Sequence, residues 1–131
     1  MDFNAYVAQF NEGDEPKLGE LFFTPDIIFD GGNRRFEGRK DVVEYLHNVA
    51  IGLKQVMTPI KVLHTDDHVM AEMNIEFIPS EDKPDFPLGP LRAGESFTLR
   101  FFGSYYLDGD RIKRIHLGNW AEPIDGRQVE P

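Results

Sequence analysis

Residues 71–77 alternate apolar and polar side chains without interruption. The apolar positions are Ala71, Met73, Ile75 and Phe77, and the polar positions between them are Glu72, Asn74 and Glu76. Because successive side chains of a β-strand point to opposite faces, this pattern predicts a strand with one apolar and one polar face. A sheet of such strands must bury its apolar face against another layer, so the chain is expected to fold its sheet over helices.

Helical patterns precede this strand. A first helix is predicted from apolar positions at i, i+3, i+4 and i+7, with Asp2 as the cap at its start,. A second is predicted after Asp14, with Pro16 in its first turn and Thr24-Pro25 at its end,. A third is predicted after Gly38. The apolar faces of the first and third helices comprise Phe3, Tyr6, Val7 and Phe10, and Val42, Leu46, Val49 and Leu53.

The remaining patterns favour strands over residues 26–30, 34–37, 60–65, 69–78, 97–107 and 111–120,. Residues 79–94 contain four prolines and two glycines. We interpret this segment as a rigid connector, and a rim or lid of the cavity is the alternative. The order of elements predicts an α+β fold, in which a curved, mainly antiparallel sheet wraps around three N-terminal helices as an open cone. Residues 1–120 are expected to form one domain, followed by a polar tail over 121–131.

Charge and composition exclude several classes of function. The formal net charge of −9 argues against nucleic acid and against an anionic membrane surface as partners,. The chain has no cysteine, which excludes disulfides, thiolate metal sites and a cysteine nucleophile,. Neither a signal peptide nor an apolar run long enough to span a membrane is recognisable, so a cytoplasmic protein is expected.

Tyr6 and Asp30 are the candidate catalytic pair. Tyr6 belongs to an apolar helix face, and Asp30 ends an apolar strand. If both point into one apolar cavity, they bring together a phenol and a carboxylate for proton transfer. The alternatives are ordinary: an aspartate before Gly31-Gly32 is common turn chemistry, and a tyrosine on a helix face often only packs.

Several segments together resemble a known family. They are Tyr6-Val7-Ala8, residues 11–14, Leu21-Phe22, Phe29-Asp30, Phe36-Glu37-Gly38 and the turn and strand over residues 107–115. The chain resembles ketosteroid isomerase and, more broadly, the SnoaL-like and nuclear-transport-factor-like superfamily. For the fold, the resemblance implies a cystatin-like α+β roll, a cone-shaped, curved, mixed but mainly antiparallel sheet around three N-terminal helices. The resemblance implies that Tyr6 donates to an oxyanion, that Asp30 shuttles the proton and that Tyr45 lines the cavity. The isomerase has a protonated aspartate as its second donor, and here Gly103 falls at that place,.

Three residues of the last two strands are further candidates for substrate binding. Asn119 and Trp120 end the last strand, where this fold opens its cavity, although capping of the strand end would explain them equally. Tyr105 shares the inward face with Gly103 and could replace the missing acid as a donor. The four histidines lack the spacing of a metal motif, so no metal or other cofactor is expected,.

These residues lead to one main hypothesis and two alternatives. The main hypothesis is a cofactor-free isomerase, cyclase or dehydratase that abstracts a proton from a small apolar carbonyl compound, polyketide- or steroid-like. The alternatives are a non-catalytic small-molecule binding module of the same fold and a dimeric interaction domain. A homodimer is implied by the resemblance, through outward-facing residues of the last two strands. These residues are Arg100, Phe102, Ser104, Tyr106, Arg114 and His116.

Overall fold

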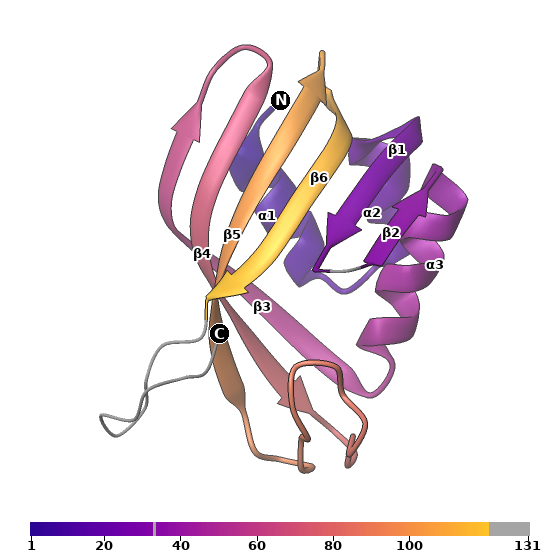
Figure 1. Cartoon of the computed structure of the whole chain (residues 1–131), viewed down its shortest axis with the longest axis vertical. Coiled ribbons are helices and arrows are strands. Elements are labelled where there is room, and N and C mark those ends of the chain that lie inside the picture. Colours follow the sequence, from indigo (N-terminus) through magenta and orange to yellow (C-terminus); the bar gives the residue numbers. More distant parts are fainter. Residues whose placement is uncertain (33, 121–131) are drawn as a thin grey trace.

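A computed structural model describes residues 1–32 and 34–120, and the expected tail over 121–131 lies outside the described residues. Within these residues, three helices and six strands follow one another (Figure 1). The helices are α1 (Phe3–Asn11), α2 (Glu15–Phe22) and α3 (Arg39–Ala50). The strands are β1 (Phe23–Gly31), β2 (Arg34–Glu37), β3 (Leu53–His64), β4 (His68–Pro79), β5 (Phe97–Asp108) and β6 (Arg111–Trp120).

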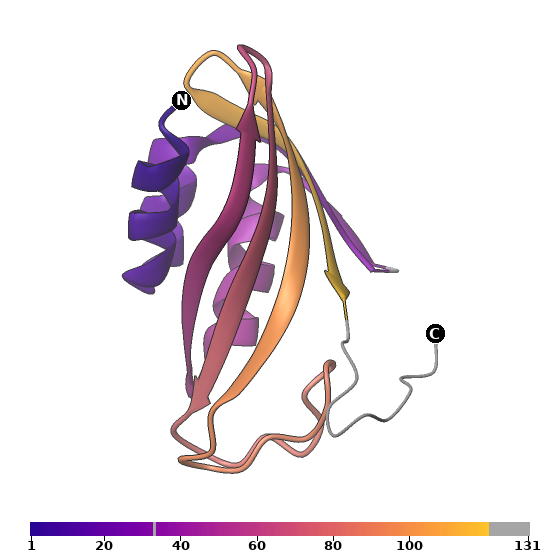
Figure 2. The ribbon, with the colours of Figure 1, turned by 90° about the vertical axis from the view of Figure 1, so that its left-hand side faces the viewer.

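The six strands form one sheet in the order β2-β1-β6-β5-β4-β3. Strand β1 runs parallel to β6, whereas the other neighbouring pairs are antiparallel. Figure 2 shows from the side how the long strands curve, with the helices on the concave side. The expected α+β cone, with a mixed and mainly antiparallel sheet around three N-terminal helices, is confirmed.

The first two helices begin where the sequence places their caps. The Asp2 carboxylate accepts hydrogen bonds from the backbone N–H groups of Asn4 and Ala5. The Asp14 carboxylate accepts one from the N–H of Lys17. These side chains satisfy N–H groups that have no partner inside the helix, so each fixes the residue at which its helix starts.

The boundary between α3 and the sheet differs from the prediction. Helix α3 ends at Ala50, and Gly52 has a φ of 67°, a conformation that continues no right-handed helix,. Leu53 is therefore the first residue of β3 and pairs with Pro79, rather than the last apolar position of the helix. The same error shortened the predicted strand to residues 60–65, because its first half was not recognised. Likewise, Thr24 and Pro25 lie inside β1 and do not close α2.

The inward faces of the strands form the core with the helices. The alternation predicted for β4 is confirmed: the apolar residues at 71, 73, 75 and 77 are buried, and the polar residues between them are half-buried on the other face. Asn11, at the end of α1, joins helix to sheet. Its side-chain amide donates to the Met57 carbonyl and accepts from the Met57 N–H, at 3.0 and 2.7 Å.

Within the described ranges, no helix combines the length and the apolar character that crossing a membrane requires.

Candidate functional site

A largely apolar cavity of about 250 Å³ lies on the concave side of the sheet. Its walls come from α1, from α3, from all six strands and from the segment between β4 and β5. The apolar lining includes Phe10, Phe29, Leu46, Met57, Ile75, Phe77, Phe101, Ile115 and Leu117. The polar groups on it are the side chains of Tyr6, Arg34, Tyr45, Gln55, Tyr105 and Asn119. None of the described residues that line it is a carboxylic acid or a histidine.

Two tyrosines from different elements meet in this cavity. Tyr6 of α1 is 3 % exposed and Tyr105 of β5 is 1 % exposed, and their ring centroids lie 5.6 Å apart. The Tyr105 hydroxyl has only a weak contact with the Met73 sulfur, at 4.0 Å. Within residues 1–32 and 34–120, the Tyr6 hydroxyl has no hydrogen-bond partner. Buried phenols usually find such a partner, so these two hydroxyls are available to a ligand.

Burial also fixes the protonation state of this pair. Loss of hydration raises the pKa of Tyr6 well above its ordinary value, because the charged phenolate is disfavoured in an apolar environment,. The pKa of Tyr105 is raised by the same burial, and further by the negative charge that Tyr6 would carry if ionised. Both phenols therefore stay protonated at neutral pH and can act as hydrogen-bond donors.

Tyr45 and Asn119 also line the cavity, as expected. The Tyr45 ring stacks on Phe36, with centroids 4.3 Å apart, and lies 5.5 Å from Phe29. Asn119 faces inward because it pairs with the inward-facing Phe101 of β5. Tyr45 thus belongs to the aromatic wall, and Asn119 is a polar group at the end of the last strand.

Trp120 does not line this cavity, so the structure does not bring it together with the other residues predicted to bind substrate. It pairs with Arg100, which faces outward, and it is 59 % exposed. Adjacent residues of a strand point to opposite faces, so Asn119 and Trp120 could not both line the same cavity.

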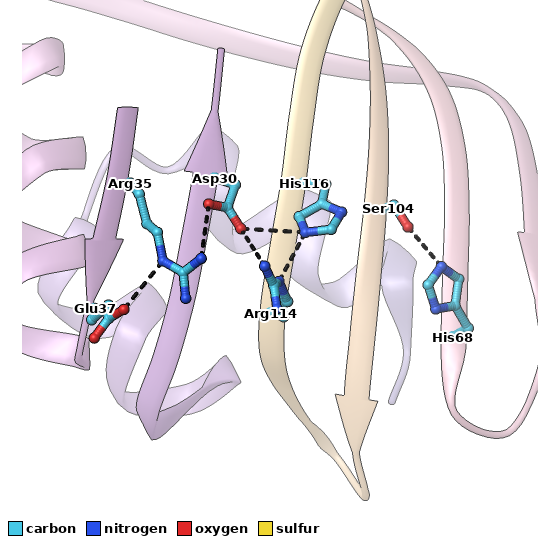
Figure 3. Close-up of polar contacts among 7 residues, drawn as sticks. All are labelled: Asp30, Arg35, Glu37, His68, Ser104, Arg114 and His116. Atoms are coloured by element: carbon cyan, nitrogen blue, oxygen red, sulfur yellow. Dashed lines mark hydrogen bonds and ion pairs between the residues drawn. The ribbon is translucent and has the colours of Figure 1, made fainter. Parts of the chain in front are cut away.

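Asp30 lies on the opposite face of the sheet from Tyr6, so the predicted convergence of the two is wrong. Phe29 is buried in the cavity wall, and the next residue of β1 must point outward,. The Asp30 carboxylate accepts a hydrogen bond from Arg114 at 3.0 Å and lies 3.3 Å from Nε2 of His116 (Figure 3). Its other oxygen lies 4.0 Å from Arg35. The side chain is 26 % exposed and takes part in a surface ion network.

The outward-facing residues of β4, β5 and β6 form a polar band beside Asp30. His68 and Ser104 are hydrogen-bonded at 2.7 Å across β4 and β5 (Figure 3). Tyr106 lies between the two histidines, 4.5 Å from His68 and 5.3 Å from His116 between ring centroids. No set of three potential ligands for a metal ion occurs in the described part of the chain.

A family model for the SnoaL-like domain matches residues 3–115. The chain belongs to the SnoaL-like family. No curated protein matches its sequence.

Solved structures share the fold of this SnoaL-like domain at low sequence identity. A proposed polyketide cyclase from Pseudomonas putida is 22 % identical with a TM-score of 0.73, and the match covers 92 % of this chain and 88 % of that one. A proposed polyketide cyclase from Xanthomonas campestris is 19 % identical with a TM-score of 0.75, over 88 % and 85 % of the two chains. A protein with a ketosteroid isomerase-like fold from Catenulispora acidiphila, in complex with trimethylamine, is 16 % identical with a TM-score of 0.70, and the match covers 88 % of this chain and 82 % of that one. At these identities the likeness establishes the fold alone.

Sequence reasoning missed part of the cavity wall in this SnoaL-like domain. Phe86, Pro87 and Leu88 lie between β4 and β5 and line the cavity, and Phe86 packs edge-to-face on Phe77 at 5.4 Å. The segment over residues 79–94 is therefore a rim of the cavity and not only a connector. The signal in the sequence was the set of large apolar residues Phe86, Leu88 and Leu91 inside a proline-rich stretch. Arg34 and Gln55 were also missed, since single polar residues at strand starts carry no such signal.

Proposed function

We propose that this SnoaL-like domain binds a small, largely apolar molecule carrying a hydrogen-bond-accepting oxygen, inside the cavity enclosed by sheet and helices. The observation that carries the proposal is the pair of buried phenols, Tyr6 and Tyr105, in an otherwise apolar wall. Apolar pockets with a few convergent polar groups are the usual form of small-molecule sites, the polar groups fixing orientation.

The size of the cavity limits the ligand. At about 250 Å³ it lies below the roughly 300–1,000 Å³ typical of pockets for drug-sized molecules,. A one- or two-ring ketone fits this range better than a four-ring steroid. The complex of the Catenulispora relative with trimethylamine supports a small ligand in the same fold.

Proton abstraction next to a carbonyl remains the second candidate function. It is favoured by the two protonated phenols, because donors held in a water-poor site stabilise a developing enolate oxygen. The names of the two proposed polyketide cyclases are compatible with this chemistry. The position of Asp30 counts against it, since the predicted base is turned away from the cavity. Binding therefore accounts for more of the geometry than an isomerase, cyclase or dehydratase does.

Titration with a matched pair of probes tests the binding proposal. 1-Tetralone carries a carbonyl oxygen, and tetralin has the same bicyclic carbon skeleton without it. Calorimetry is expected to show tighter binding of the ketone, and Tyr6→Phe should weaken the ketone about fivefold while leaving tetralin unchanged. Failure of both probes to bind, or an equal loss for both in Tyr6→Phe, would contradict the proposal.

The same ketone separates a binder from an enzyme. An enzyme that abstracts the proton next to the carbonyl will exchange it for deuterium in heavy water, which NMR detects directly. Under the binding proposal the exchange rate with wild-type protein equals the buffer rate. Catalysed exchange that disappears in Tyr6→Phe would instead establish the second candidate.

We also propose a homodimer formed through the outer face of β4, β5 and β6. Met70 and Phe102 are exposed apolar residues on this face, and negative carboxylates and positive guanidinium groups lie beside them. Two copies related by a two-fold axis can match such charges and bury the apolar residues. Light scattering is expected to give the dimer mass at micromolar concentration, and Phe102→Glu the monomer mass. A monomeric wild-type protein would refute the dimer and leave the cavity proposal untouched.

A further inference from the structure

Gly103 lies beneath the Tyr105 ring on the inner face of β5. A Cβ atom built on Gly103 would be 2.6 Å from Cε2 and 2.9 Å from the hydroxyl oxygen of Tyr105, and 2.8 Å from Cε of Met73. Real Cβ atoms do not come this close to other heavy atoms, so a side chain at position 103 would displace its neighbours. Met73 ends in a flexible thioether and can yield, whereas the Tyr105 ring is rigid and 1 % exposed,.

The backbone does not require glycine at this position. Gly103 is not among the glycines with a positive φ, and it pairs regularly with Ala71 on β4 and Leu117 on β6. In such a strand alanine would ordinarily be tolerated or favoured, because glycine loses more conformational freedom on folding. Position 103 therefore has to be glycine because the Tyr105 ring occupies the space that a Cβ atom would fill.

The space above Gly103 determines where the second phenol lies. With the ring in that space, the Tyr105 and Tyr6 centroids are 5.6 Å apart at an interplanar angle of 64°. Both tyrosines line the cavity, Tyr105 from β5 and Tyr6 from α1. A carbonyl oxygen has two lone pairs and can accept from both donors, whereas a hydrocarbon leaves both donors unpaired in an apolar cavity.

We infer that Gly103 is a specificity-determining residue: it seats Tyr105 so that the cavity selects a ligand with a carbonyl-type oxygen able to accept two hydrogen bonds. This inference rests on the proposed function and adds to it the residue that determines the ligand class. Gly103 acts through Tyr105 and contacts no ligand in this account, so it is a positioning residue.

The test is the ratio of the affinities for 1-tetralone and tetralin, measured in Gly103→Ala. Displacing one of two phenols is expected to lower the ratio about fivefold, as Tyr105→Phe does, with the affinity for tetralin little changed. The double variant Gly103→Ala/Tyr105→Phe should be no worse than either single variant. Gly118→Ala is the matched control, because a Cβ at this strand glycine meets nothing within 4 Å. It should retain the wild-type ratio.

The outcomes separate this inference from the proposed function. If the wild-type protein does not prefer 1-tetralone over tetralin, the proposed function is wrong. A wild-type preference that Gly103→Ala leaves unchanged overturns only the role of Gly103. If Gly103→Ala is too unstable to titrate, the melting temperature decides: in a Tyr105→Leu background the same substitution should cost no stability. A loss as large as in the wild-type background would overturn the inference.

Discussion

Alkaline pH should destabilise this protein through the two buried phenols. The unfolded chain releases the protons of Tyr6 and Tyr105 near the ordinary tyrosine pKa of about 10. Burial raises both pKa values in the native state, so the native protein retains these protons at a pH where the unfolded chain has lost them. The native state then binds more protons than the unfolded state, and the free energy of unfolding must fall as pH rises above about 10.

The magnitude follows from the number of retained protons. Each phenol that stays protonated contributes a slope of about 1.4 kcal/mol per pH unit, so the pair contributes about 2.8 kcal/mol per unit. Below pH 10 the native and the unfolded states both hold these protons, so the two phenols contribute nothing to the slope there. Urea unfolding at a series of pH values measures the slope. Tyrosinate absorbance of the native protein should fall short of that of the unfolded protein by these two phenols.

Phenylalanine variants separate this effect from other groups that titrate at high pH. Tyr6→Phe removes one phenol, keeps the ring packing, and should reduce the slope by about 1.4 kcal/mol per pH unit. Tyr105→Phe should do the same. A slope in either variant that equals the wild-type slope would refute the burial of that hydroxyl in an apolar cavity.

Three further substitutions test other parts of the structure. Asp30→Asn weakens an ion network at a partly exposed site and should lower the free energy of unfolding by about 1 kcal/mol or less,. The affinity for 1-tetralone should not change. A fivefold loss of affinity would show that Asp30 contributes to ligand binding. Asn11→Ala removes both hydrogen bonds to the Met57 backbone and should cost about 2 kcal/mol in chemical denaturation, and a cost near zero would show that water replaces the amide,. Phe86→Ala removes a buried ring from the cavity rim and should lower the free energy of unfolding by about 3 kcal/mol,. The affinities for 1-tetralone and tetralin should fall equally. A loss of affinity for the ketone alone would contradict the role of Phe86 as an apolar wall.

The architecture could be predicted because several levels of the sequence agree. The alternation over residues 71–77 fixed which face of β4 is buried, and the apolar face of the first helix placed Tyr6 inside. The capping residues Asp2 and Asp14 located the starts of two helices. The strand following α3 was predicted too short because Ile51-Gly52 was not recognised as the helix end, although glycine commonly takes that place,.

The candidate site was only partly predictable because it depends on which face of the sheet each strand residue points to. Asp30 was assigned to the cavity from its place at a strand end, but the neighbouring Phe29 already occupies the inward position. A shift of one residue moves a side chain to the other face of a sheet, so Asp30 and Trp120 were both misplaced by the smallest possible error. The space that Tyr105 takes above Gly103 depends on contacts between β4, β5 and α1, which no local pattern contains.

The infrared stretching frequency of the carbonyl in bound, isotope-labelled 1-tetralone is the most direct measurement of the central claim. Two phenol donors on that oxygen would lower the frequency below its value in an apolar solvent, and Tyr6→Phe and Tyr105→Phe would each restore part of the difference. A bound ketone that absorbs at the frequency found in an apolar solvent would contradict the claim, because its oxygen would then accept no hydrogen bond from either tyrosine.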